Sequence, residues 1–173
     1  MRIALIAFSL LLAACTNSPE YQAAARMTDN PTQVRAFLSD TTVRSYSGPH
    51  GTQIEYLAAD GRSHLLYPGN ARIVPGEWQI RGSGEINAEM CFRYGPNTYN
   101  PATGSHGSNW ECGFLTDYLM YRDEIIDGDV LRLAGRTVVP APLPKRQNLT
   151  IGQVQSMWGL PVTNGPNKSL GSR

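Results

Sequence analysis

The chain has 173 residues, a formal net charge of +1 and 17% charged residues. This length favours a single folded domain with its own hydrophobic core. The basic residues form no block, which excludes binding driven by the phosphates of a nucleic acid or by an anionic membrane surface. The 17 glycines and 12 prolines, with aromatic residues scattered between them, indicate a β-rich domain with many turns.

An apolar run near the N-terminus, residues 3–12, follows one positive charge and leads into Leu12-Ala13-Ala14-Cys15. A membrane-spanning helix needs about 20 apolar residues, so this run is too short to be one. The four residues resemble the lipobox of bacterial lipoproteins, in which the segment before the cysteine is removed and the cysteine is lipidated. An ordinary secretory signal is the alternative, because its cleavage sites also use small residues.

The lipobox resemblance implies a location as well as a modification. Residues 1–14 would be the signal peptide, and residues 15–30 would be the lipidated N-terminus and a tether, partly helical, that anchors the domain to a membrane. Thr16 stands where retention in the inner membrane typically uses Asp. The resemblance therefore implies transport to the outer membrane, with the domain on its periplasmic face. Acylation on more than one site would make the attachment permanent.

A β domain is predicted over residues 31–138. It begins with a short helix at residues 31–38, which starts at a proline and places apolar residues on one face. Alternating polar and apolar residues, separated by turn residues, then predict a small antiparallel meander of seven or eight strands, forming a barrel or a sandwich. The strands are expected at residues 42–46, 52–57, 62–67, 77–81, 89–94, 109–115, 118–122 and 130–136, with Asp-Gly hairpin turns at 60–61 and 127–128.

A third segment, residues 139–173, is predicted to leave the sheet, because three prolines fall within seven residues at its start. Thr150 is expected to cap a short helix that Gly159 ends. This stretch is similar to the turn-helix segment of small outer-membrane assembly lipoproteins, although any capped short helix has the same pattern. The last dozen residues are expected to be disordered.

Cys91 and Cys112 are an even pair once Cys15 is assigned to lipid. In an oxidising compartment such a pair is expected to form a disulfide. A reactive or metal-bound pair is the alternative, but the chain has no Cys-x-x-Cys motif and no histidine at ligand spacing beside either cysteine. We therefore expect no metal site and no cofactor.

Three short motifs lie on the expected strands, and they are Gly76-Glu77-Trp78, Cys91-Phe92-Arg93-Tyr94 and Trp110-Glu111-Cys112. By pattern they resemble domain of unknown function 995, a family of small exported proteins, over about residues 35–136. The resemblance implies a β fold with two cysteines and brings no known activity.

The histidines give no catalytic pattern, because none lies in a His-x-His or His-Glu-x-x-His motif. A hydrolase would require His50, His64 or His106 to converge with a carboxylate or a hydroxyl group. The acidic cluster at residues 123–129 lacks the alternating oxygens of a calcium loop. An enzyme is therefore not the expected function.

The aromatic residues predict either the core of a small β domain or the lining of a cavity for a small apolar ligand or a sugar ring. The long loop at residues 95–108 is the expected contact surface. We expect a non-enzymatic outer-membrane lipoprotein that binds an envelope protein or glycan; the alternatives are a lipocalin-like carrier of small ligands, an inhibitor of lysozymes, and a hydrolase. The candidate binding residues are Trp78, Tyr94, Tyr99, His106 and Trp110.

Overall fold

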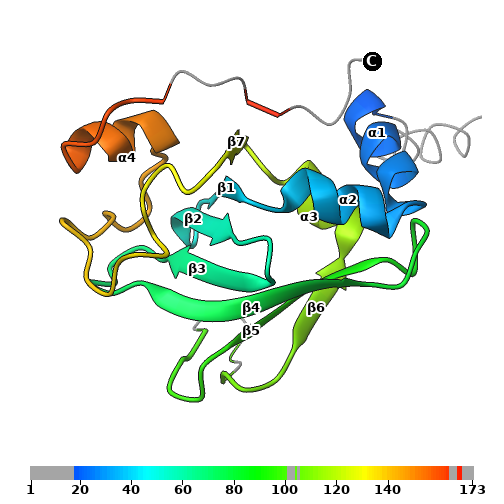
Figure 1. Cartoon of the computed structure of the whole chain (residues 1–173), viewed down its shortest axis with the longest axis horizontal. Helices are drawn as coiled ribbons and strands as arrows, with labels where there is room; N and C mark the ends of the chain where they lie inside the picture. The colour runs from blue at the N-terminus through cyan, green and yellow to red at the C-terminus, as the bar shows by residue number, and fades with distance from the viewer. Residues whose placement is uncertain (1–17, 101–103, 105, 164–166, 169–173) are drawn as a thin grey trace, which may run out of the picture.

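The computed structural model describes residues 18–100, 104, 106–163 and 167–168 (Figure 1). Seven antiparallel strands form one sheet in the spatial order β6-β5-β4-β3-β2-β1-β7. The sheet curls into a half-barrel, which confirms the predicted mainly β class. The strands are β1 (Thr41–Ser47), β2 (Gly51–Leu57), β3 (Arg62–Leu66), β4 (Val74–Arg81), β5 (Glu89–Tyr94), β6 (Glu111–Phe114) and β7 (Glu124–Asp127).

Strands β1 to β6 follow one another across the sheet as a meander. Gly61 adopts a φ of +91° in the turn between β2 and β3, as the Asp-Gly pair predicts. Strand β7 breaks the order, because it pairs with β1 at the opposite edge and places Ile125 beside Val43. Cys91 lies opposite Cys112 in the β5–β6 pair, and the predicted disulfide joins them.

The helices are α1 (Pro19–Thr28), α2 (Pro31–Leu38), α3 (Leu115–Met120) and α4 (Ile151–Met157). Asn30 caps α2, because its side chain accepts a hydrogen bond from the backbone N–H of Gln33 at 3.0 Å. Thr150 and Gln153 form a reciprocal capping box at α4, so the short helix expected near the C-terminus is present. Helices α1, α2 and α3 gather over one end of the sheet, and α4 lies apart from them (Figure 1).

The sheet has a hydrophobic core on each face. The first core joins helices α1, α2 and α3 to the concave face, with Trp78 and Met90 among its buried residues. The second core joins α4 and the chain around Leu131 to the convex face. Successive strand residues point to opposite faces, so Ile125 packs in the first core and Ile126 in the second. Strand β7 is thus buried on both sides.

The folded domain extends beyond both boundaries expected from the sequence. Helix α1 packs against α3, and its Ala24 and Thr28 are fully buried. Residues 19–30 are therefore part of the domain and not a free tether. At the other end, Leu143, Ile151 and Trp158 are buried in the second core. The segment after residue 138 leaves the sheet as predicted, but it covers the convex face.

Three expected elements are wrong. The strand expected at residues 118–122 lies mostly in helix α3, where Leu115 and Leu119 are spaced by four and bury one helical face. The hairpin tip expected around residues 125–130 contains strand β7. The strand expected at residues 130–136 is a series of turns, in which the Asp129 carboxylate accepts hydrogen bonds from the backbone N–H groups of Leu133 and Ala134.

The outer edge of β7 contacts a piece of the C-terminal segment. The backbone N–H of Ile125 donates to Asn167 Oδ1 at 2.7 Å, and the backbone N–H of Lys168 donates to the Ile125 carbonyl at 2.8 Å. The Lys168 ammonium also lies 2.5 Å from Asp127. These two residues are ordered against the sheet, whereas the sequence predicted disorder. Cys15, the leader before it and residues 164–166 and 169–173 lie outside the described residues.

Candidate binding site

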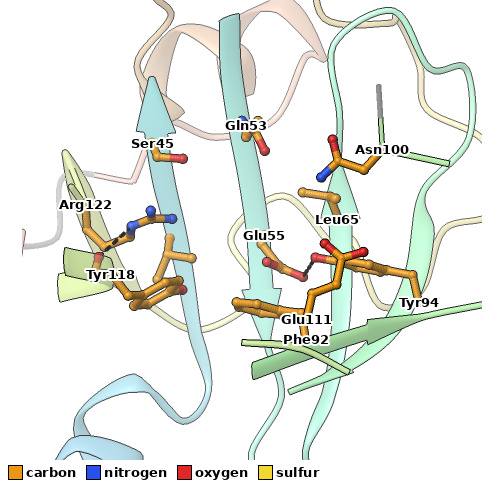
Figure 2. A pocket seen from close by; sticks show the side chains of 11 residues that line it. Ser45, Gln53, Glu55, Leu65, Phe92, Tyr94, Asn100, Glu111, Tyr118 and Arg122 are labelled. Carbon is orange, nitrogen blue, oxygen red and sulfur yellow. Dashed lines mark hydrogen bonds between the residues drawn. The ribbon is translucent and has the colours of Figure 1, made fainter. Parts of the chain in front are cut away.

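The helices cover only one end of the concave face. Leu57, Trp78 and Met90 lie under them, while the same strands continue beyond the helices to Gln53 and Tyr94. A cavity of about 250 Å³ occupies this open end. Residues from β1 and β6, which are far apart in the sheet order, line the same cavity because the sheet is curled. The lining residues are Val43, Ser45, Gln53, Glu55, Leu65, Phe92, Tyr94, Asn100, Glu111, Tyr118 and Arg122 (Figure 2).

Glu55 is the most deeply buried charged group of the cavity. Its exposed fraction is 8%, and its carboxylate accepts a hydrogen bond from the hydroxyl of Tyr94 at 2.9 Å (Figure 2). Among the described residues it forms no ion pair. Burial raises the pKa of Glu55 to about 7, although the bond from Tyr94 opposes this rise. Near neutral pH Glu55 is therefore divided between its acid and carboxylate forms.

Gly76 of β4 sets the position of Tyr94. A Cβ atom at residue 76 would lie 2.6 Å from Cδ1 of Tyr94, 2.9 Å from the Arg93 carbonyl and 2.9 Å from Oγ of Ser63. Only glycine allows this close approach of the tyrosine ring to the strand. The ring is consequently held where its hydroxyl meets Glu55.

A row of aromatic rings forms one wall of the cavity. The Phe92 ring lies 6.2 Å from Tyr94 in a stacked arrangement and 5.8 Å from Tyr118 in a tilted one. The Arg122 guanidinium lies 4.2 Å above the Tyr118 ring, and its Nε donates to the Tyr118 carbonyl at 3.0 Å. The Tyr118 hydroxyl is buried and, among the described residues, makes no hydrogen bond of normal geometry, although the Arg122 guanidinium lies close enough to oppose the rise of its pKa. Burial raises the pKa values of both tyrosines, so both hydroxyls stay protonated at neutral pH.

Polar side chains from four other positions complete the cavity. Figure 2 shows Ser45, Gln53 and Asn100 at one side of it and Glu111 beside Tyr94. Asn100 belongs to the long loop after β5, so this loop contributes to the cavity. The lining therefore combines carboxyl, amide, hydroxyl and guanidinium groups with aromatic faces.

The described part of the long loop folds back on itself. Gly107 approaches the chain so closely that a Cβ atom there would lie 1.8 Å from the Gly95 carbonyl oxygen. Its backbone N–H donates to the Thr98 carbonyl at 3.0 Å. Tyr99 and His106 form an isolated bridge, and their rings lie 5.0 Å apart. The loop is thus built like a hairpin that extends β5.

The five candidate binding residues are not brought together. Tyr94 lines the cavity, whereas Trp78 is only 2% exposed and donates its indole N–H to the Ala58 carbonyl at 2.9 Å, which makes it part of the core. Tyr99 and His106 pair on the loop. Trp110 lies outside the cavity, and its ring contacts two guanidinium groups, those of Arg81 at 5.4 Å and Arg93 at 4.8 Å.

Glu55 and Arg122 are not predicted as cavity residues by the sequence, whereas Tyr118 is one of the aromatic residues for which the sequence predicts either a core or a cavity lining. In β2 the apolar residues Ile54 and Tyr56 alternate with Gln53 and Glu55, so the pattern places Glu55 on the opposite face from Ile54 and does not show that this face is also covered. The sheet register supplies the missing information, because Glu55 pairs with Val43 and Leu65, both of which face the concave side. Gly76, two positions before Trp78, is a local signal in the sequence that another group approaches the backbone of β4 closely.

The histidines do not assemble a catalytic group. His50 Nδ1 lies 2.7 Å from the Tyr67 hydroxyl, His64 stacks on Tyr56, and His106 contacts Tyr99. Among the described residues, no hydrogen bond links any of these histidines to a carboxylate. One group, Glu89 with Cys91 and Cys112, has metal-ligand atoms close together in that part of the chain. Its two cysteines are bonded to each other, so their thiolates are not available to a metal.

No protein-family model matches this chain, and no curated protein and no solved structure matches it. The resemblances to bacterial lipoproteins and to domain of unknown function 995 therefore stay predictions. In the described part of the chain, no helix has the length and apolar character needed to cross a membrane.

Proposed function

We propose that this protein is a lipid-anchored envelope protein that binds a small polar ligand in the half-barrel cavity, without chemical turnover. The observation that carries this proposal is the contrast within the concave face. One end is filled by helices, while the other end holds a cavity lined by the buried Glu55 and by half-buried polar side chains. A protein that only needed a stable core would be expected to fill this space with apolar side chains, because a buried carboxyl group costs free energy.

The size and lining of the cavity favour a small polar ligand over a lipid. Pockets for drug-sized molecules measure about 300–1,000 Å³, and this cavity of about 250 Å³ lies just below that range. A long apolar chain would also have to lie against Glu55 and Glu111. The cavity therefore supports the small-ligand alternative in a modified form, without the large apolar chamber of a lipocalin.

The anchor would hold this cavity close to a membrane. Ser18 caps α1, and it is the third residue after Cys15 in the sequence. Because an extended chain spans at most about 3.6 Å per residue, Ser18 would lie within about 11 Å of the lipidated cysteine. Helix α1 is packed on the domain, so the distance from anchor to domain would be short.

Lipidation is tested by metabolic labelling with palmitate in a bacterial host. The wild-type protein should carry the label and fractionate with the outer membrane. Cys15→Ser should abolish both while the domain keeps its β-type circular dichroism. An unlabelled wild-type protein that retains residues 1–14 would overturn the anchor.

Ligand binding is tested by calorimetric titration of the detergent-solubilised protein with low-molecular-weight fractions of envelope digests. Heat of binding that disappears in Tyr94→Phe, and persists in Tyr46→Phe as a control outside the cavity, is the expected result. Chemical conversion of the bound compound would contradict the proposed absence of turnover, and the absence of any binding fraction would contradict the binding function.

A protein partner is a second candidate, favoured by one observation. Tyr99 is 59% exposed at the tip side of the loop and pairs with His106, so the loop presents an aromatic surface next to the cavity. Exposed aromatic residues are enriched at protein interfaces. Loss of a co-purifying envelope protein in Tyr99→Ser, with ligand binding unchanged, would support this candidate.

A further inference from the structure

We infer that the cavity binds one uncharged sugar unit at the end of a glycan, and that the Glu55–Tyr94 pair forms hydrogen bonds with its hydroxyl groups. This inference rests on the proposed function and specifies the ligand of the same site. It depends on four properties of the cavity, namely its charge, its hydrogen-bonding groups, its aromatic wall and its shape.

The charges around the cavity nearly cancel. The carboxyl groups are those of Glu55 and Glu111, and the cation is Arg122. Glu111 and Arg122 balance each other, and Glu55, whose pKa is raised by burial to about 7, adds less than one full negative charge near neutral pH. A site without excess charge gives no electrostatic advantage to an anionic or a cationic ligand. The balance favours a neutral molecule.

The hydrogen-bonding groups of the cavity include both donors and acceptors. Glu55, Gln53 and Asn100 can accept hydrogen bonds, and the amide and hydroxyl groups can also donate. Within the described part of the chain the buried Tyr118 hydroxyl makes no hydrogen bond of normal geometry, and such a group usually makes one in a native protein. A ligand with several hydroxyl groups satisfies mixed donors and acceptors, because each hydroxyl both donates and accepts.

The aromatic wall and the volume fit a single ring. The faces of Phe92 and Tyr118 provide apolar surface for the C–H groups of a pyranose. The volume of about 250 Å³ lies just below the range of about 300–1,000 Å³ that is typical of pockets for drug-sized molecules. One pyranose ring with its substituents is of this size, and two linked rings are larger. The site is therefore sized for one sugar unit.

The shape of the site favours the terminal unit of a glycan over an internal unit. The first core closes the inner end of the concave face, so a glycan cannot pass through. The chain beyond the bound unit would leave past Asn100 and the loop that carries Tyr99. This arrangement brings the exposed aromatic residues of the loop next to the following sugar unit.

The test is calorimetric titration of the detergent-solubilised protein with the methyl glycosides of glucose, galactose and N-acetylglucosamine. Glucuronic acid and glucosamine serve as charged controls. At least one neutral glycoside should bind ten times more tightly than both charged sugars, and its β-linked disaccharide should bind no more than a few times more tightly. Tighter binding of a charged sugar, or no binding of any neutral sugar, would overturn the inference.

Removal of the hydroxyl group from Tyr118, compared with its removal from Tyr121, distinguishes the loss of a ligand contact from a loss of structure. Tyr118→Phe should weaken binding of the neutral glycoside about tenfold, because the buried hydroxyl loses its bond to the ligand, and it should not lower the midpoint of thermal unfolding. Tyr121→Phe is the matched control, since Tyr121 is 66% exposed at the end of the same helix. Equal affinities of both variants and the wild type would contradict the proposed contact.

The pH dependence of binding tests the role of Glu55. The titratable and charged groups that line the cavity with it are Tyr94 on β5, Glu111 on β6, Tyr118 on α3 and Arg122. Burial raises the pKa of Glu55 to about 7, so its acid form donates to a sugar hydroxyl below pH 7 and is lost above it. Affinity should fall about tenfold from pH 6 to pH 9 in the wild type and in the control Glu20→Gln, which changes an exposed residue of α1 outside the cavity. It should stay constant in Glu55→Gln, which keeps a donor.

The outcomes distinguish the inference from the proposed function. If a compound from envelope digests binds in a Tyr94-dependent manner and none of the neutral glycosides does, the sugar assignment is wrong and the binding function stands. If neither binds, both are wrong. A fall in affinity with pH that persists in Glu55→Gln would remove Glu55 from the contact while leaving the sugar in place.

Discussion

The two ends of the concave face are built from the same strands and differ in what covers them. At the closed end Leu57 and Met90 lie under the helices and are almost completely buried. At the open end the same two strands carry Glu55 and Tyr94, which line a cavity. Side-chain polarity therefore changes along each strand within a few residues. The site is the part of the half-barrel that the helices leave uncovered.

The closed end is expected to contribute mainly to the stability of the fold, and the open end mainly to binding. The closed end gains free energy from apolar burial, at roughly 25 cal/mol per Å². The open end contains a buried carboxyl group, and burial of such a group opposes folding. We therefore expect substitutions at the closed end to change mainly the free energy of unfolding. Substitutions at the open end should change mainly affinity and pH dependence.

The largest expected effect is that of Trp78→Ala at the closed end. Trp78 is 2% exposed and packs between the helices and the sheet, so its removal should cost about 3–5 kcal/mol of unfolding free energy. Urea unfolding followed by circular dichroism measures this change. Tyr99→Ala, at a position that is 59% exposed, is the control and should cost less than about 0.5 kcal/mol. Similar losses in both variants would contradict the assignment of Trp78 to the core.

The second largest effect on stability is expected from removal of the disulfide. This bond joins the strand that carries Tyr94 to the strand that carries Glu111. Cys91 and Cys112 are separated by 21 positions, and closing such a loop stabilises the folded state by about 3 kcal/mol. The double replacement by alanine should show this loss in urea. The wild type with reductant should behave in the same way, while reductant should not affect the double variant.

Glu55→Gln should produce an effect whose size depends on pH. Folding raises the pKa of this carboxyl group from 4.5 to about 7, so deprotonation favours the unfolded chain. The wild type should lose up to about 3 kcal/mol of stability as pH rises from 4 to 8, because each pKa unit corresponds to about 1.4 kcal/mol. The variant should lack this loss and be more stable than the wild type at pH 8.

The control for this pH effect is Glu20→Gln, since Glu20 is exposed in the first turn of α1. Its stability profile between pH 4 and pH 8 should follow that of the wild type. A wild-type stability that rises across this interval, or a Glu55→Gln profile that matches it, would show that Glu55 is not held in its acid form by burial.

Gly76→Ala should have the smallest effect on stability and a clear effect on binding. The new Cβ would displace Tyr94 from Glu55 and press on the Arg93 carbonyl, at a cost of about 1–3 kcal/mol. Gly113→Ala in β6 is the matched control, because a Cβ there meets nothing within 4 Å. Thermal unfolding and ligand titration should both leave the control unchanged. Full affinity in Gly76→Ala would show that Gly76 does not position Tyr94.

Local signals in the sequence were sufficient for the parts of the fold that local interactions determine. Asp60-Gly61 predicted a hairpin because glycine accepts a positive φ, and Thr150 predicted a helix start because its hydroxyl caps the backbone. Cys91 and Cys112 predicted their disulfide because they were left as a pair. Each of these inferences depends on chemistry within a few residues or on a simple count.

The remaining parts depend on contacts between distant segments. Leu131 and Leu133 are two positions apart, as apolar residues on one face of a strand are, but both side chains reach the second core from turns. The two isoleucines of β7 look like an apolar interruption of a charged turn, and they are buried because both faces of the strand are covered. The inward position of Glu55 required the register of three strands. The residue pattern of β2 alone does not indicate which residues of the neighbouring strands lie beside Glu55.

The pairing of Asn167 and Lys168 with β7 affects how molecules would meet when they are crowded on one surface. An open sheet has two edges with backbone groups that can recruit another chain and start aggregation. At one edge the C-terminal segment occupies the N–H and carbonyl of Ile125. The other edge is β6, which is four residues long. The protein thus offers little template for intermolecular strand addition, so a high surface density should not drive fibril growth.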